Sequence, residues 1–249
     1  MPHLIKKSNK RLVICNKVIK LINYEKPFFY NFPPLKRSRS IFIEKQDRRL
    51  DNTQRAKNKL KNLILSNYGV NKQMVLFVTF TFAENIVNPK QANPEWKLFI
   101  LRLNYYLNSL GFQKAKYITV IEFQERGAVH YHTLFFNIPY IKNIKTEFAR
   151  LWALGFVKIK AIPFNDSNHC ANYVSKYMTK TFNDKFFSSS KNYFCSRNIK
   201  KPIKLRNEND IVSMLQQLDN EYILEIEHTE KYISQKYGLV EFTQLNLLN

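Results

Sequence analysis

Residues 116–137 read KYITVIEFQERGAVHYHTLFFN, and their pattern sets the architecture of the middle of the chain. Two segments, 116–123 and 129–137, are rich in β-branched and aromatic residues and predict strands. Arg126 and Gly127 lie between them and have the character of a tight turn. The stretch therefore predicts a β-hairpin and, with it, an antiparallel sheet.

Segments on both sides of this hairpin show either strand or helix patterns. In strands, apolar and polar side chains alternate with a period of two residues, whereas in helices apolar residues recur every three or four positions. The order strand, helix, hairpin, helix, strand, helix favours an α+β fold, with helices packed mainly on one face of a central antiparallel sheet. The predicted strands are residues 75–82 and 156–162, and the predicted helices are residues 94–111, with Pro94 in the first turn, 144–154 and 167–181.

The chain is strongly basic. Its 249 residues carry a formal net charge of +21, from 40 basic and 19 acidic side chains. Such an excess favours a polyanionic partner, because each Lys or Arg that meets a phosphate releases condensed counterions.

The cysteine content and the hydropathy of the chain indicate the cellular compartment. Cys15, Cys170 and Cys195 are widely spaced, which provides neither a disulfide framework nor a Cys-x-x-Cys metal pair. No apolar run approaches the roughly 20 residues that a bilayer span needs, and the N-terminus lacks a clean signal peptide. We therefore expect no membrane partner and no secretion, with the cytoplasm or another interior compartment of a host cell, organelles included, as the location.

His130 and His132 form the first chemical motif. Side chains at i and i+2 of a strand point to the same face, so both imidazoles can reach one metal ion. A one-residue bulge in the turn would place Glu122 opposite His130 on that face; in another register Glu125 would be the third ligand. Surface decoration is the alternative interpretation of the histidine pair alone.

The second motif is a pair of tyrosines on the last predicted helix. Tyr173 and Tyr177 are four residues apart and therefore share one helix face. Lys176 and Lys180 follow them at i+3 and bring positive charge beside the two hydroxyls. Amphipathic packing is the alternative interpretation of this spacing.

Together the two motifs suit one reaction. A neutral phenol is a poor nucleophile, with a pKa near 10. A metal can polarise a phosphate oxygen, and lysines can favour the phenolate. Attack on single-stranded DNA would leave a 5′-phosphotyrosine and a free 3′-hydroxyl, and a second tyrosine could attack the regenerated junction.

Three blocks, within about residues 71–182, resemble the His-hydrophobic-His (HUH) endonuclease superfamily, specifically rolling-circle replication initiators of small phages and plasmids with two tyrosines. The blocks are FVTFTF at residues 77–82, EFQERGAVHYH at residues 122–132 and YVSKYMTK at residues 173–180. The resemblance implies a five-stranded antiparallel palm of the ferredoxin or RNA-recognition-motif type, and cleavage of an origin hairpin in single-stranded DNA.

The resemblance also implies Mg²⁺ or Mn²⁺, held by His130, His132 and Glu122; imidazole ligands alone would suit zinc as well. Tyr173 and Tyr177 would be the nucleophiles, with Tyr173 favoured as the first, and Lys176 would assist them. The remaining candidates for DNA contact are Thr79, Thr81, Arg126 and Lys180. No phosphate-binding loop of the Gly-x-x-x-x-Gly-Lys type is present, so host helicase and polymerase are expected partners.

Charge and motifs divide the chain into three parts. We expect a basic N-terminal arm and helix over residues 1–70, the endonuclease core over residues 71–182, and an extension with an acidic tail over residues 183–249. The arm is either a strand-binding surface or a flexible leader. Residues 221–230 of the tail are a candidate helix.

Two other classes of function compete. A relaxase or single-strand transposase would use nearly the same chemistry. A non-catalytic, RNA-recognition-like sheet would bind single strands through exposed aromatic residues and would have no use for converging Glu122, His130 and His132.

Overall fold

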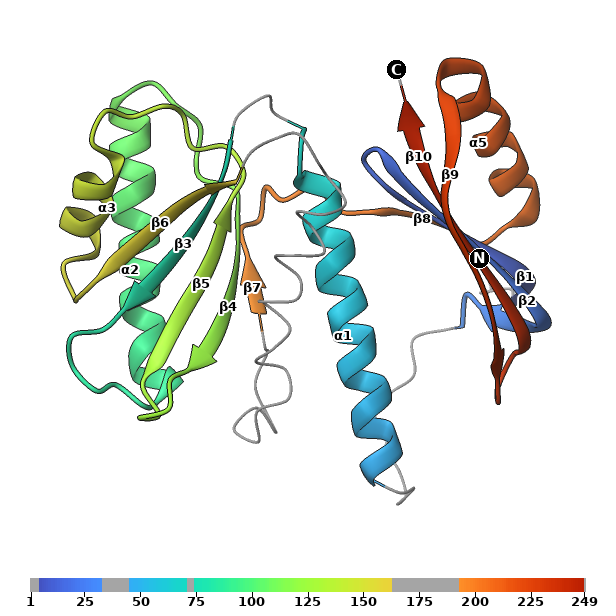
Figure 1. Ribbon diagram of the computed structural model, residues 1–249, viewed down its shortest axis with the longest axis horizontal. Coiled ribbons are helices and arrows are strands. Elements are labelled where there is room, and N and C mark those ends of the chain that lie inside the picture. Colours follow the sequence, from blue (N-terminus) through green and yellow to red (C-terminus); the bar gives the residue numbers. More distant parts are fainter. Residues whose placement is uncertain (1–4, 33–44, 71–73, 163–192, 249) are drawn as a thin grey trace. The chain divides into compact units, whose positions relative to one another are not determined.

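The computed structural model describes residues 5–32, 45–70, 74–162 and 193–248 (Figure 1). The chain divides into two compact units, one formed by Met1–Leu50 with Lys201–Asn249 and the other by Asp51–Lys200. Each unit contains one five-stranded antiparallel sheet. The α+β class expected from the sequence is confirmed. The first unit combines both ends of the chain, whereas the division by charge treats the two ends as separate parts.

The sheet of the second unit has the strand order β6-β3-β5-β4-β7. Without β7, its elements follow the β-α-β-β-α-β order of ferredoxin-like folds, as the resemblance implies. The helices α2 and α3 cover the same face of the sheet, because their buried residues join one hydrophobic cluster. The elements are β3 (Val75–Thr81), α2 (Pro89–Ser109), β4 (Tyr117–Phe123), β5 (Val129–Phe135), α3 (Ile144–Trp152), β6 (Val157–Ile162) and β7 (Tyr193–Cys195).

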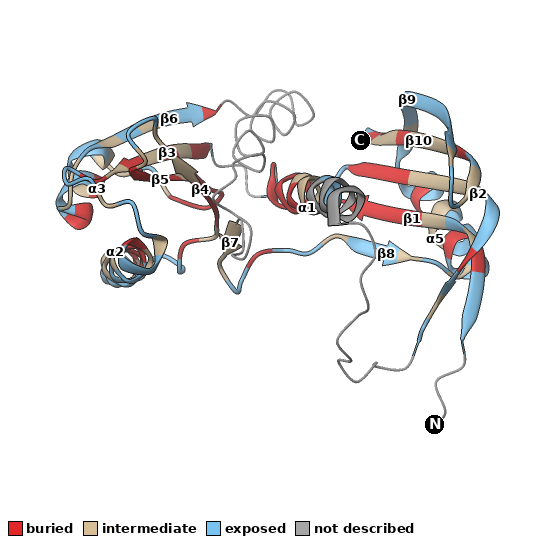
Figure 2. Cartoon of the chain, turned by 90° about the horizontal axis from the view of Figure 1, so that it is seen from below, coloured by how far each residue is buried: buried red, intermediate tan, exposed pale blue. Residues whose placement is uncertain are grey.

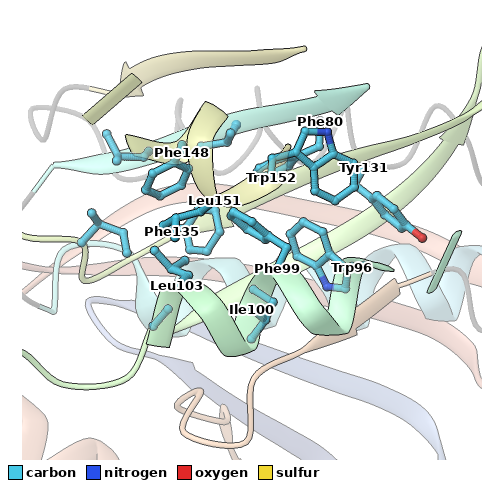
Figure 3. Close-up of a cluster of buried hydrophobic side chains, with 14 of the residues drawn as sticks. Phe80, Trp96, Phe99, Ile100, Leu103, Tyr131, Phe135, Phe148, Leu151 and Trp152 are labelled. Carbon is cyan, nitrogen blue, oxygen red and sulfur yellow. The ribbon is translucent and has the colours of Figure 1, made fainter. Parts of the chain in front are cut away.

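Aromatic side chains fill the space between this sheet and its helices (Figure 3). Phe80 is fully buried and meets Trp96 edge to face at 5.1 Å and Trp152 at 5.3 Å between ring centroids. Each fully buried aromatic or aliphatic side chain of this size stabilises the fold by about 1.5–3 kcal/mol. Figure 2 shows this burial as red segments on α2 and on the central strands. The aromatic core therefore lies on one face of the sheet. The other face, called the open face below, carries half-buried polar side chains beside buried apolar ones, among them Val120 opposite His132.

The helix α2 begins earlier than its sequence pattern predicts. Its first residue is Pro89, and the side chain of Asn88 caps it by accepting a hydrogen bond from the backbone N–H of Lys90. Pro94, predicted in the first turn, lies inside the helix. An asparagine cap followed by proline at the first helical position is a strong start signal, and it prevails over the later proline.

The turn between β4 and β5 has the bulged geometry that the two histidines require. Gln124 and Ala128 close the loop, with the N–H of Gln124 donating to the carbonyl of Ala128 at 2.9 Å. Gly127 has φ of +81°, the left-handed conformation of the bulge residue in a three-residue hairpin loop. This odd-numbered loop sets the register in which Glu122 lies opposite His130.

The first unit holds a sheet that the sequence pattern does not reveal. Its order is β8-β1-β2-β10-β9, and the helix α5 packs on it through Ile211 and Leu218. The basic N-terminal segment is thus a long hairpin paired with the C-terminal strands. The elements are β1 (Lys6–Cys15), β2 (Val18–Tyr30), β8 (Ile203–Leu205), α5 (Glu208–Glu221), β9 (Ile223–Ser234) and β10 (Gly238–Leu248).

The prediction of a helix over residues 221–230 is wrong, because these residues mostly belong to β9. Isoleucine, threonine and tyrosine in this segment favour a strand, and an eleven-pair ladder with β10 supplies the backbone hydrogen bonds. The helix α1 (Lys45–Asn67) is the helix expected within residues 1–70, and Leu60, Leu63 and Ile64 are buried as its apolar stripe. Among the described residues, no helix is long and apolar enough to span a bilayer.

We expect Gly155→Ala to lower the free energy of unfolding by at least about 3 kcal/mol. A Cβ at this position would lie 2.2 Å from the carbonyl oxygen of Thr81 and 2.5 Å from the backbone nitrogen of Ala83, and φ is +149°. Both backbone atoms are hydrogen-bonded to residues adjacent to Gly155, Phe156 and Leu154. They therefore cannot move away from the new Cβ without breaking these hydrogen bonds. The midpoint temperature of thermal unfolding should fall by about 6–12 °C.

Gly111→Ala is the matched control for this prediction. Gly111 also has a positive φ, of +79°, but a Cβ there would meet no atom within 4 Å. The Gly111→Ala substitution should therefore lower the free energy of unfolding by only about 1–2 kcal/mol, through conformational strain alone. Equal losses for the two variants would show that the contacts of Gly155 are unimportant.

Candidate active site on the open face of the sheet

Three strands bring the predicted ligands together on the face opposite the aromatic core. In the ladder of β4 and β5, Glu122 lies directly opposite His130. In the ladder of β3 and β5, Thr81 lies opposite His130 and Thr79 lies opposite His132. All five side chains are half-buried. The predicted register is therefore found, and the residues form one row of polar groups across the sheet.

Tyr131 shows that the alternation is real. It lies between the two histidines in sequence but points to the other face, where it is fully buried. Its hydroxyl donates to the side-chain oxygen of Asn93 at 2.9 Å. Burial raises the pKa of Tyr131 well above its usual range, so this phenol is kept neutral and takes no part on the open face.

The imidazole of His132 is held on three sides. The hydroxyl of Thr79 lies 3.1 Å from Nδ1, and the carboxylate of Glu122 contacts Nε2. The ring of Phe77 stacks on the imidazole with 5.6 Å between centroids and an angle of 6° between planes. Because a hydroxyl can donate or accept, Thr79 can satisfy Nδ1 in either tautomer. Nε2 can therefore either donate to Glu122 or offer its lone pair to a cation, without turning of the ring.

His130 has an unsatisfied nitrogen. Its Nε2 atom is buried, and it has no hydrogen-bond partner among the residues that the structure describes. Burial lowers the pKa of His130, the charges of His132 and Arg126 lower it further, and Glu122 opposes them. The imidazole is thus held in the neutral form, which is the form that binds metals. A buried polar atom without a partner costs free energy, and a bound cation would remove that cost.

Two imidazoles and a carboxylate are a donor set that suits a divalent transition metal. The residues do not yet form a closed cage: the rings of His130 and His132 are 6.2 Å apart at 72°, and no three His, Cys, Asp or Glu residues converge on one point within the described ranges. Binding a metal would require these side chains to move closer together, and the contact between Glu122 and Nε2 of His132 would be exchanged for contacts with the cation.

The other predicted residues have different surroundings. Arg126 is exposed in the hairpin loop, where its guanidinium donates to the side chain of Gln124 at 3.0 Å and to the carbonyl of Phe82 at 3.4 Å. Glu125 is also exposed in this loop, whereas Glu122 occupies the ligand position. The remaining site candidates, Tyr173, Lys176, Tyr177 and Lys180, lie outside the described residues.

The structure adds residues to this face that sequence reasoning misses. On the neighbouring strand β6, Lys158 lies opposite Thr79 and Lys160 lies opposite Phe77. On the far side, Tyr193 of β7 lies opposite Val120. The alternation of residues 157–162 already places the two lysines on one face of a strand, but only the pairing of β6 with β3 shows that this is the face of the histidines.

The fold and this row of residues define a ferredoxin-like palm with a candidate metal site on its open face. Residues 75–182 match the family model described as Replication-associated protein ORF2/G2P. This segment contains β3 to β6, the polar row and the two-tyrosine motif. The match indicates a role in DNA replication and is consistent with a rolling-circle replication initiator. No curated protein and no solved structure matches the chain.

Proposed function

We propose that this protein initiates rolling-circle replication by nicking single-stranded DNA and joining itself to the 5′ end of the cut. The observation that carries the proposal is the row of His130, His132 and Glu122 on the open face of a palm whose sequence matches a replication-associated family. On this proposal the protein is a metal-dependent endonuclease of the HUH type that acts inside the host cell, with host helicase and polymerase as its partners.

His130, His132 and Glu122 would hold Mg²⁺ or Mn²⁺. The cation would supply polarisation of a non-bridging oxygen at the scissile phosphate. The contacts on this face support the assignment: Thr79 and Phe77 fix the ring of His132, and burial keeps His130 neutral. The role of Thr79 would then be to position a ligand, in addition to the predicted contact with DNA.

Tyr173 or Tyr177 would supply the nucleophile. The phenolate oxygen attacks phosphorus, the bond from phosphorus to the 3′ oxygen breaks, and that oxygen takes up a proton to become a free 3′-hydroxyl. The DNA keeps its 5′ phosphate as an ester of the tyrosine. Lys176 would favour the phenolate and offset charge on the phosphate. The second tyrosine can attack the regenerated junction while the first still holds the old 5′ end.

Cationic and polar groups beside the row would bind the strand. Lys158 is exposed on β6, opposite Thr79, and Arg126 is exposed at the end of the hairpin. With Thr81 and Lys180 they would provide contacts to the phosphates of the strand. Such contacts orient the phosphorus for in-line attack.

A covalent-adduct assay tests the proposal. The protein is mixed with a library of single-stranded oligonucleotides and Mn²⁺, and the products are separated in a denaturing gel. A label at the 3′ end should travel with the protein, and a label at the 5′ end should appear on a shorter fragment that a polymerase can extend. EDTA should abolish both products, and fully duplex DNA should yield neither.

The result also separates the competing classes. Undiminished adduct in EDTA would contradict the metal assignment, and no adduct on any single-stranded substrate would leave only a basic nucleic-acid-binding protein. A relaxase or transposase would form the same adduct but would not support repeated rounds of synthesis from one nicked circle with helicase and polymerase added.

A further inference from the structure

The N-terminal hairpin and the last two strands carry a connected row of aromatic rings. The centroid of Tyr24 lies 5.0 Å from that of Tyr237 and 5.3 Å from that of Phe28, and Phe28 lies 6.1 Å from Tyr30. Tyr232 of β9 lies opposite Val240, which lies opposite Tyr24, so it extends the row across the sheet. We refer to Tyr24, Phe28, Tyr30, Tyr232 and Tyr237 as the aromatic row.

Three cations lie over these rings. The guanidinium of Arg11 is 4.9 Å from the centre of Phe28, that of Arg206 is 5.8 Å from Tyr30, and the ammonium of Lys236 is 5.2 Å from Tyr237. Nε of Arg11 is buried and has no hydrogen-bond partner among the described residues.

The described carboxylates leave these three positive charges without an ion pair. Two acidic groups of β9 and β10 have other partners: Glu230 is 3.7 Å from His228, and Glu241 pairs with Lys231. Exposed lysines of the same hairpin add to the positive field, namely Lys6, Lys7, Lys10 and Lys26.

We propose that the aromatic row and its cations form a second surface for single-stranded nucleic acid, on the first compact unit and distinct from the polar row of the palm. Phe28 is buried and supports the row, whereas Tyr30 and Tyr237 are half-buried and Tyr232 is exposed. Accessible rings beside cations suit a strand whose bases stack while its phosphates contact Arg and Lys. A duplex hides the faces of its bases and could use only the charges. The contacts described above support the surface itself. The further statement that it binds the DNA of the origin rests on the proposed function.

Fluorescence anisotropy with a labelled 20-residue oligothymidylate and the full chain tests this surface. In the variant Arg206→Ala with Lys236→Ala, both at exposed positions, affinity should fall by about 10-fold or more. The slope of log affinity against log salt should fall by about 1.4, because each lost phosphate contact on a single strand removes about 0.7. The control, Lys142→Ala with Lys145→Ala, makes the same change in charge at exposed positions of the other unit.

Tyr30 tests the stacking. Tyr30→Leu should weaken binding by about 10-fold, whereas Tyr30→Phe should retain it, because stacking needs the ring and not the hydroxyl. Thermal unfolding of each variant shows whether it is folded. Equal losses in the Lys142 and Lys145 control, equal affinity for duplex of the same length, or full affinity of folded Tyr30→Leu would each overturn the proposal.

The adduct assay keeps the two proposals apart. If the unmodified protein forms no adduct but the binding losses are found, the proposed nicking function falls and this surface stands.

Discussion

Removal of both phenol hydroxyls, by Tyr173→Phe with Tyr177→Phe, is expected to reduce covalent adduct by about 1,000-fold or more, to the background of the gel. Phenylalanine keeps the aromatic ring but has no oxygen to join to phosphorus, and loss of a catalytic nucleophile costs rates of this order. Binding of the uncleaved oligonucleotide should be unchanged, because neither hydroxyl is needed to hold the strand.

The single variants distinguish the two tyrosines. Tyr173→Phe should remove the first cleavage, whereas Tyr177→Phe should leave it and block the second transfer. Tyr140→Phe is the control, because Tyr140 is 90% exposed and lies outside the motif. Adduct formed by the double variant at the normal rate would mean that another residue is the nucleophile.

Loss of either imidazole should reduce adduct formation nearly as much as loss of both phenol hydroxyls. His130→Ala and His132→Ala are each expected to weaken Mn²⁺ binding by at least about 100-fold, the upper end of what loss of an outer-shell partner costs a metal site. Titration calorimetry or the paramagnetic signal of free Mn²⁺ measures this without any DNA. Adduct formation should fall in parallel and recover partly at high Mn²⁺.

His228→Ala provides the matched control, because this histidine is exposed on β9 of the other unit. Its Mn²⁺ affinity should equal that of the unmodified protein. If all three variants bind Mn²⁺ equally well, the row of His130, His132 and Glu122 is not the metal site, and the short contact between His132 and Glu122 has only a structural role.

The parts of the site that sequence patterns predict are those that depend on near neighbours. Glu122 and His130 are only eight residues apart, and one turn with Gly127 in a left-handed conformation sets their register. A hairpin is local, so its geometry follows from the residues of its own loop. The start of α2 is equally local, yet the signal of Asn88 and Pro89 is easily overlooked beside Pro94.

The parts that patterns do not predict depend on distant pairing. Thr79 meets His132 across 53 positions of the chain, and Lys158 joins the same face only because β6 pairs with β3. The second sheet is the extreme case, since β2 pairs with β10 more than two hundred residues away. Side chains with the right alternation fit many partners, and the choice among them depends on the packing of the whole unit.

Local patterns in the amino-acid chain were therefore sufficient for the α+β class, the hairpin and the two histidines on one face, because period and turn chemistry act over a few residues. Tertiary contacts alone held the ring of His132 between Thr79, Phe77 and Glu122, and they alone brought both ends of the chain into one basic, aromatic sheet. Such contacts arise when strands remote in sequence bury their apolar faces together, and no local pattern specifies that choice.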